Sequence, residues 1–261
     1  MFTKDELKLQ IKEMGVLPGD TVIIHTSMRK IGEVEGGADT VIDAFKEYLS
    51  EGLFLVPTHT WDLVCPKMPI YDVNKTVPVI GALPRVAAFR EDGIRSLHPT
   101  HSVWATGRGA EEFIAGEEKA ESPSPPKFLW DRLADVKAKI LLLGVGNDKN
   151  TFIHSVDEVL DIPDRLNDET FEVIVLDADG KEYRHPYRGH HCSKSDDVSE
   201  NFVNFEKAFV EMGVQTYGKF GNAEVRIVDA AKAKELLIKI YSHADRDLCI
   251  DKMEIPEEWY K

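Results

Sequence analysis

The chain has 261 residues, which is enough for one large domain or two small ones. Hydrophobic residues make up 43% of it and are spread along its length, so a sizeable core can form. The net charge of −14 argues against a nucleic-acid partner, because binding a phosphate backbone requires a basic face, whereas it is compatible with a cationic substrate or with solubility alone.

The N-terminal quarter predicts a helix followed by a strand–helix–strand unit. A capping box at residues 3–6 opens the first helix. Residues 21–25 are rich in β-branched side chains and predict a buried strand. Residues 39–49 place apolar side chains at helical spacing, and residues 53–56 predict a second strand. Because a helix connects the two strands, we expect them to pair in parallel.

The middle of the chain alternates short elements with breaker segments. Prolines and polar residues predict a surface loop over residues 65–78. Residues 139–145 form the clearest buried strand, and a polar loop leads from it into a helix over residues 150–160. Further elements are predicted at residues 82–89 (helix), 102–106 (strand) and 110–114 (helix).

The C-terminal half predicts antiparallel additions. A β-hairpin is expected over residues 171–176 and from 182 onward, and a second hairpin over residues 214–228. Helices are predicted at residues 199–212 and 230–241. We therefore expect an α/β fold in a single domain over residues 1–261: a mixed, mainly parallel central sheet with flanking helices and β-hairpins in the C-terminal half.

His154 is the main candidate for catalysis. It follows a buried strand at the start of a helix, where α/β sheets usually bind ligands. Asp157 lies three residues later and Glu158 four, so either carboxylate could orient the imidazole. The helix N-terminus favours the neutral form that a general base requires. Spacing alone favours a structural histidine satisfied by a carboxylate, and Asp148, His154 and Glu158 lack the spacing of a zinc signature.

The residues that end and follow the first strand carry groups suited to a phosphate. Hydroxyls, backbone N–H groups and two cations at a strand end can hold a phosphate, and Gly36-Gly37 before a helix offers a second such terminus. The pattern matches neither a Walker loop nor a dinucleotide fingerprint, so an ordinary solvated loop stays open as the alternative. The segment consists of His25, Thr26, Ser27, Met28, Arg29, Lys30, Ile31 and Gly32.

A third segment stands at the head of the strand predicted over residues 102–106. His98 precedes Pro99, which holds it extended, so its imidazole could point into a cleft. Taken alone, this pattern favours a simple turn.

Together these segments resemble the aminoglycoside 3-N-acetyltransferases, also called antibiotic N-acetyltransferases. The similar stretches occur in the family's order and cover nearly the whole chain, and their combination is specific where each alone is not. The resemblance is separate from the GNAT acetyltransferase fold, whose acetyl-CoA loop is not found here. The stretches are HTSMRKIGEVEGGADTVIDAF, LFLVPTHTWD, SLHPTHSVWATG, LLLGVGNDKNTFIHSVDE and YGKFGNAEVRIVDAAKA.

The resemblance implies acetyl-CoA as donor and an amine of an aminoglycoside or similar cationic acceptor. His154 would be the general base, and Asp157 stands where the family commonly has Glu. The 25–32 segment would hold the pyrophosphate and pantetheine end of coenzyme A. Trp104 stands where family members often carry a small residue. The residues that would line the pantetheine arm and thioester are His98, Pro99, Ser102 and Val103. His98 is also a candidate catalytic residue.

We expect the amine to attack the thioester directly, since no cysteine has a predictable base partner. A side chain near Ser102 or Thr58 would stabilise the oxyanion. Asp62, Asp148 and Glu158 are candidates for binding acceptor ammonium groups, together with Thr58 in the substrate site. No metal is expected.

Two rival functions stay open. A metal-dependent hydrolase could use the cluster His185, His190, His191, Cys192 and Asp196, although adjacent histidines on a strand would point to opposite faces. Stoichiometric zinc in the purified protein would favour it. A coenzyme A-binding protein without turnover is the second rival.

The three cysteines are odd in number and far apart, which favours a reducing cytoplasm over a disulfide framework. The N-terminus lacks the apolar core of a signal peptide, and the apolar runs are too short to span a bilayer. No membrane partner is expected, and a homodimer is one alternative for the oligomeric state.

Overall fold

The central feature of the fold is a mixed β-sheet. The computed structural model describes residues 1–250 and 254–261, and in these residues seven strands are hydrogen-bonded in the order β4-β5-β2-β1-β6-β10-β9. The neighbours β2, β1 and β6 are parallel, and the strands outside them pair antiparallel. Their bounds are β1 Thr21–Thr26, β2 Leu53–Pro57, β4 Ile94–Arg95, β5 Val103–Gly107, β6 Lys139–Leu143, β9 Gln215–Phe220 and β10 Ala223–Asp229.

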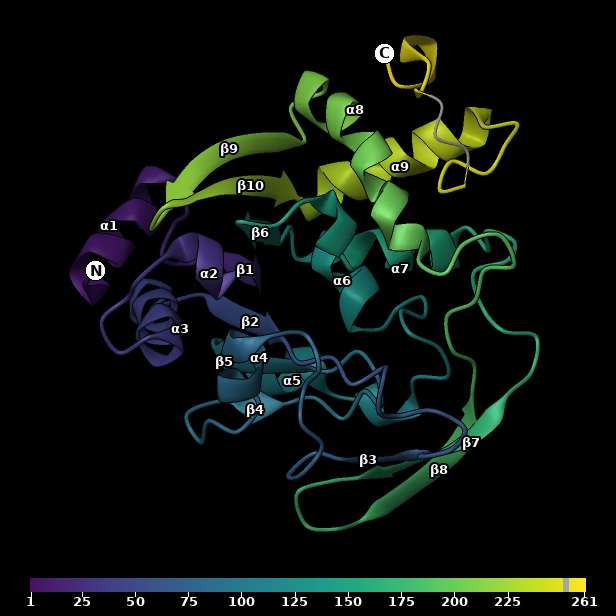
Figure 1. The fold of residues 1–261 in the computed structure, drawn as a ribbon, viewed down its shortest axis with the longest axis horizontal. Coiled ribbons are helices and arrows are strands. Elements are labelled where there is room, and N and C mark those ends of the chain that lie inside the picture. The colour runs from purple at the N-terminus through teal and green to yellow at the C-terminus, as the bar shows by residue number, and fades with distance from the viewer. Residues whose placement is uncertain (251–253) are drawn as a thin grey trace.

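Helices cover both faces of this sheet (Figure 1). One core packs the sheet against α1 (Lys4–Glu13), α2 (Met28–Ile31), α3 (Ala38–Tyr48) and α4 (Ala82–Ala87). The other packs it against α5 (Ala110–Ile114), α6 (Leu129–Asp135), α7 (Phe152–Val159), α8 (Glu206–Glu211) and α9 (Ala230–His243). The parallel strands can therefore be apolar throughout, as the buried β2 sequence LFLVP illustrates. Short 3₁₀ helices are η1 Glu117–Lys119, η2 Asn147–Lys149, η3 Val198–Phe205 and η4 Glu257–Trp259.

A small second sheet lies at the edge of the molecule (Figure 1). It consists of β3 (Ile70–Asp72), β7 (Phe171–Leu176) and β8 (Glu182–Tyr187), with its own apolar cluster around Tyr71 and Tyr187. β3 pairs in parallel with β7, about a hundred residues later in the chain.

Most predicted elements are confirmed, including the parallel β1–β2 pair and both C-terminal hairpins. The expected surface loop over residues 65–78 is wrong in part, because it contains β3. The predicted helix over residues 199–212 divides into the 3₁₀ helix η3 and the α-helix α8. Both differences arise from packing against distant segments, which local periodicity does not record.

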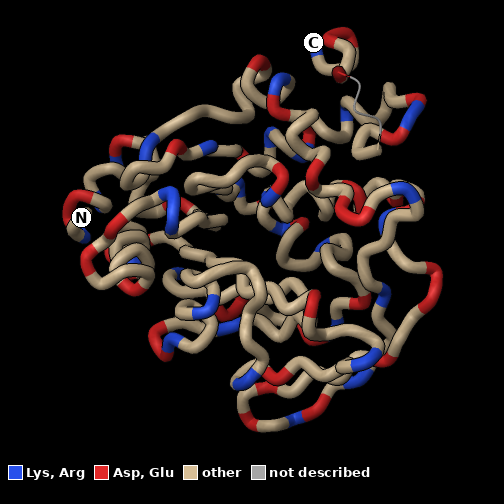
Figure 2. The backbone as a smooth tube through the Cα atoms, in the orientation of Figure 1, with Lys and Arg blue, Asp and Glu red and all other residues tan. Residues whose placement is uncertain are grey.

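Within the described residues, no helix is both long enough and apolar enough to cross a membrane. Figure 2 shows acidic and basic residues interspersed along the backbone.

Candidate active site

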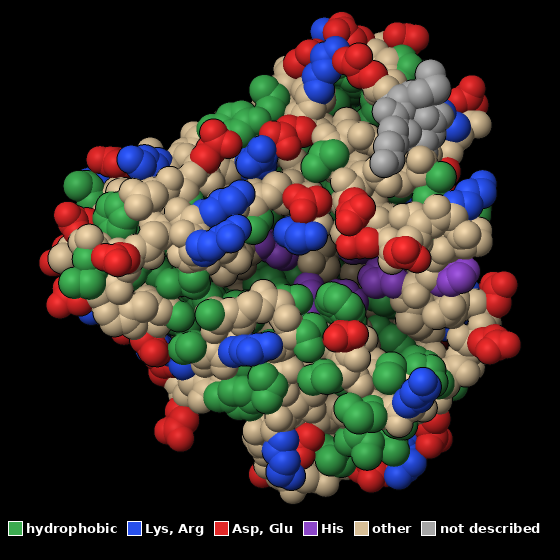
Figure 3. All heavy atoms as spheres, viewed as in Figure 1, with side chains coloured by type: hydrophobic (Ala, Val, Ile, Leu, Met, Phe, Trp, Pro, Cys, Tyr) green, Lys and Arg blue, Asp and Glu red, His purple; other side chains and the backbone are tan. Residues whose placement is uncertain are grey.

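A cavity of about 780 Å³ opens where the parallel strands end. Its wall includes Thr26 at the end of β1, Pro57 at the end of β2, and Val145 just beyond β6. Residues of the 190–199 segment also line it. Figure 3 shows histidine side chains gathered in the hollow on this face of the molecule. This is the crevice where open α/β sheets bind ligands.

The segment over residues 25–32 only partly lines this cavity. The residues from His25 to Arg29 lie in its wall, whereas Lys30, Ile31 and Gly32 do not. The segment is not an open loop, because residues 28–31 form the single turn α2 and thereby bury the Ile31 side chain in the core. The structure therefore places only the first five residues of the predicted cofactor-facing run in the cavity wall, and the role of the run in cofactor binding stays a prediction.

His154 lies in the first turn of α7 and lines the cavity. Its ring packs on His190, with centroids 4.3 Å apart, and on Phe202 at 4.8 Å. Its Nδ1 atom is buried and has no hydrogen-bond partner among the described residues. Burial, followed by the nearby His190 and Arg165, lowers the pKa of His154 well below 6.5. The imidazole is therefore neutral at pH 7, as a general base must be.

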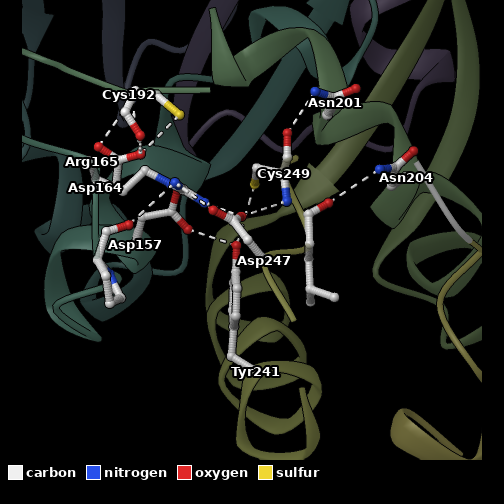
Figure 4. Close-up of polar contacts among 12 residues, drawn as sticks. Asp157, Asp164, Arg165, Cys192, Asn201, Asn204, Tyr241, Asp247 and Cys249 are labelled. Atoms are coloured by element: carbon white, nitrogen blue, oxygen red, sulfur yellow. Dashed lines mark hydrogen bonds and ion pairs between the residues drawn. The ribbon is translucent and has the colours of Figure 1, made fainter. Parts of the chain in front are cut away.

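Neither predicted carboxylate orients His154. The carboxylate of Asp157 accepts hydrogen bonds from Arg165 Nε (3.2 Å) and from the Tyr241 hydroxyl (2.8 Å) (Figure 4). Burial raises the pKa of Asp157 to about 6. In this structure, partners outside α7 occupy the Asp157 carboxylate.

Glu158 is likewise turned away from the cavity. Its carboxylate accepts hydrogen bonds from the Ser122 hydroxyl and from the Ser124 backbone N–H, the latter at 2.7 Å. Burial raises the pKa of Glu158 to about 7. Glu158 thus ties α7 to the 122–124 segment and does not line the predicted substrate site.

His98, which was predicted to line the thioester site, lies outside the cavity wall in this structure. Its side chain is fully buried, and Nδ1 accepts the backbone N–H groups of Thr100 (3.3 Å) and His101 (3.0 Å). The imidazole therefore closes a turn, and burial lowers its pKa to about 3. His101, the residue that this turn presents, lines the cavity instead.

The neighbouring predicted residues are also buried. The Pro99 carbonyl accepts from Thr60, Ser102 and Thr58 join their hydroxyls at 2.8 Å, and Val103 belongs to the core. None of these four predicted residues, Thr58 among them, lines the cavity.

The remaining predicted positions also divide. Asp62 is exposed and lies outside the cavity wall, whereas Asp148 lines it and pairs with Lys149 at 3.2 Å. Trp104 lies on β5, and its buried side chain packs on Phe54 in the core. It does not line the cavity.

Two cavity histidines escaped prediction. His59 and His101 continue the contact of His154 and His190 into a row of four cavity-lining imidazoles, here called the histidine row. Their ring centroids are 4.6 Å apart for His59–His101 and 5.2 Å for His101–His190. Burial and the neighbouring imidazoles lower the pKa values of His59 and His101 well below 6.5. His59 could have been predicted, because the THTWD sequence that contains it follows the parallel strand β2 directly, just as the 25–32 segment ends and follows β1.

The rival metal cluster does not assemble. His190, His191, Cys192 and Asp196 line the cavity, but His185 lies on β8 outside its wall. Among residues 1–250 and 254–261, no three His, Cys, Asp or Glu residues are arranged to hold a metal ion.

A model of the family described as aminoglycoside 3-N-acetyltransferase matches residues 23–242. The chain belongs to this family. As a family member it is an enzyme, an acyltransferase. The match begins within β1 and includes the other strands of the central sheet and all of the cavity wall.

Individual members of the aminoglycoside 3-N-acetyltransferase family are similar over most of the chain. Aminoglycoside N(3)-acetyltransferase III of Serratia marcescens is 26% identical over 253 residues, covering 88% of this chain and 93% of that enzyme. The crystal structure of aminoglycoside acetyltransferase AAC(3)-Xa superposes with a TM-score of 0.79 at 26% identity, covering 94% and 95% of the two chains. AAC-IIIb, solved as a binary complex with CoASH, shares the fold at 21% identity and a TM-score of 0.78, covering 94% and 99%.

Proposed function

We propose that this acyltransferase transfers the acetyl group of acetyl-CoA to an amine of an aminoglycoside or similar cationic acceptor, with His154 as general base. The observation that carries the proposal is the neutral imidazole of His154 in the wall of a cavity at the carboxyl ends of the parallel strands. In a chain of this family, such a base can take a proton from the attacking amine.

Coenzyme A is supported as the donor by the AAC-IIIb complex and by the residues at the end of β1. Thr26 and Ser27 supply hydroxyls, and Arg29 supplies a cation beside the cavity. Such groups suit the pyrophosphate of coenzyme A. The cavity, which is more than large enough for one small ligand, would then receive the pantetheine arm.

A cationic acceptor is supported by the charge of the chain and by carboxylates in the cavity wall. Asp148, Asp196 and Asp197 line the cavity, and the net charge is −14. Carboxylates at a cavity wall attract ammonium groups and raise their local concentration. We therefore assign the acceptor to the part of the cavity that these carboxylates line.

The proposed reaction proceeds in one displacement. His154 removes a proton from the acceptor ammonium, and the free amine nitrogen then attacks the thioester carbonyl carbon. The carbon–sulfur bond breaks as the carbon–nitrogen bond forms. The departing thiolate takes the second proton, which the new amide nitrogen sheds, and the imidazolium releases its proton to solvent. Cys192 lies in the wall but shares its thiol with Asp164 at 3.5 Å, so it is not required as a nucleophile.

The test is release of free thiol from acetyl-CoA in the presence of an amine panel. The panel comprises aminoglycosides, linear polyamines and simple monoamines, and mass spectrometry identifies any acetylated product. We expect turnover with polycationic amines and weak or no turnover with monoamines. Coenzyme A binding without turnover across the panel would contradict the proposal, and stoichiometric zinc with hydrolysis would favour the metal-dependent rival.

A further inference from the structure

Arg165 is a buried cation beside the candidate base that the proposed reaction does not use. Its side chain is only 3% exposed and lies between two carboxylates (Figure 4). Nε donates to Asp157 at 3.2 Å, and the two terminal nitrogens donate to Asp247 at 3.1 and 2.5 Å. Tyr241, from α9, donates to the same Asp157 carboxylate. The guanidinium therefore joins α7 to the segment that follows α9.

The backbone around Arg165 holds a second segment, residues 189–193. The Arg165 carbonyl accepts the His191 N–H at 3.0 Å, and Leu166 forms an antiparallel bridge with His190. The Asn167 N–H donates to the Gly189 carbonyl at 3.0 Å. When the ion pairs of its side chain fix Arg165, the backbone contacts of residues 165–167 therefore also fix the 189–193 segment.

The carboxylate of Asp164 extends this anchoring. It accepts the Ser193 N–H at 2.9 Å and the Ser193 hydroxyl at 2.7 Å, and the Cys192 thiol lies 3.5 Å from it (Figure 4). The 189–193 segment is therefore bonded at several points to residues 164–167. Residues 164–167 are in turn held to α7 by the Arg165–Asp157 pair.

The 189–193 segment delivers His190 to the ring of His154. The centroids are 4.3 Å apart, and both ring nitrogens of His190 are buried without a hydrogen-bond partner among the described residues. The position of His190 therefore depends on its backbone and on packing. Asp157 lies one helical turn beyond His154 on α7. The Asp157–Arg165 ion pair therefore ties the segment that carries His190 to the same helix that carries His154.

We propose that Arg165 is a positioning residue for acyl transfer: by bridging Asp157 and Asp247, it keeps the 189–193 segment on α7 and holds His190 against the His154 imidazole. The proposal rests on the proposed role of His154. Small displacements of a catalytic group matter, because a 1 Å error in geometry can cost about 100-fold in rate.

The charged and titratable groups around this pair define a pH signature. Arg165 faces Asp157, Asp247 and Cys249, and its charge also lowers the pKa values of His154 and His190. Removing the guanidinium removes that effect and admits water beside the ring. The pKa of His154 should then rise, so the acidic limb of the rate profile should move to higher pH.

The test compares Arg165→Met with Arg132→Met. Arg132 pairs with the fully buried Glu117 at 2.9 Å, and neither residue lines the cavity, so this control removes a partly buried arginine from a buried carboxylate elsewhere. We expect Arg165→Met to lower kcat about 100-fold with the KM for acetyl-CoA changed less than about threefold. Arg165→Lys should restore part of kcat, and Arg132→Met should retain wild-type kcat.

A structural measurement separates the positioning role of Arg165 from the general-base role of His154. With isotope-labelled histidine, NMR should detect a nuclear Overhauser contact between the His154 and His190 rings in the wild type and in Arg132→Met, but not in Arg165→Met. If the contact and kcat both survive in Arg165→Met, the positioning role is wrong. If His154→Gln keeps full activity, His154 is not the general base. The contact between the His154 and His190 rings, compared between the wild type and Arg165→Met, then still tests whether Arg165 positions His190.

Should Arg165→Met not fold, Asp247→Asn carries the test. It weakens one side of the bridge and leaves the Asp157–Arg165 contact in place. A reduced ring contact and reduced kcat support the proposal, whereas wild-type values of both overturn it.

Discussion

At the scale of single residues, the site depends on burial more than on pairwise charge. The sequence predicted His154 correctly as a cavity residue but assigned it a carboxylate partner. Asp157 and Glu158 both satisfy other groups, because distant Arg165 and Ser122 reach them in the fold. Spacing along a helix indicates which side chains could meet, but not which of them a remote segment has already engaged.

The lowered pKa of His154 makes a kinetic prediction. Because a base must be neutral, and because burial lowers the pKa of His154 well below 6.5, kcat/KM should show no acidic limb near pH 6.5. The profile should be measured between about pH 5 and 8 with an acceptor that remains an ammonium throughout. A limb at or above pH 6.5 would contradict the assigned environment of His154.

Glu158 makes a stability prediction. Burial raises its pKa from 4.5 to about 7, so the folded state favours the protonated form. Its contribution to stability is present below pH 4.5 and is lost as the pH rises through about 7. In Glu158→Gln, the free energy of unfolding in urea should therefore fall less over this range than in the wild type. Equal slopes in the two proteins would refute this.

At the scale of elements, the sequence predicted most strands and helices because their apolar periodicity is local. It also predicted that catalysis would sit where strands end, and β1, β2 and β6 all end at the cavity. β3 escaped prediction because its three residues are a strand only through pairing with β7. His59 and His101 escaped because the turns that present them lack a regular pattern.

The turn after β6 leaves no room for a side chain at Gly144. Gly144 has φ +71°, and a Cβ there would lie 2.7 Å from the Cβ of Lys30 and 3.2 Å from that of Ala223. Gly144→Ala should cost about 1–3 kcal/mol of stability and lower activity, because this turn leads into residues 145–154 of the cavity wall. Thermal unfolding and thiol release measure both effects.

Gly19→Ala is the matched control for that substitution. Gly19 has no positive φ, and its Cβ would meet nothing within 4 Å. It should change stability by less than about 0.5 kcal/mol. A Gly144→Ala protein as stable as Gly19→Ala would show that the turn tolerates a side chain.

At the scale of the whole molecule, one cavity joins two different chemistries. The end of β1 brings hydroxyls and a cation, the 190–199 segment brings carboxylates, and the histidine row lines the same cavity. Composition and the family resemblance could indicate a donor site at the end of β1 and a cationic acceptor. The sequence could not indicate the row, since its four members come from four separate segments that only the folded sheet brings together.

The most direct test of the account is His154→Gln compared with His185→Gln, a histidine outside the cavity wall. Thiol release from acetyl-CoA with a productive amine gives kcat, and calorimetry gives the affinity for coenzyme A. We predict that His154→Gln loses at least about 100-fold in kcat while it keeps coenzyme A affinity, and that His185→Gln matches the wild type. Near wild-type turnover in His154→Gln would contradict the role of His154 as the general base.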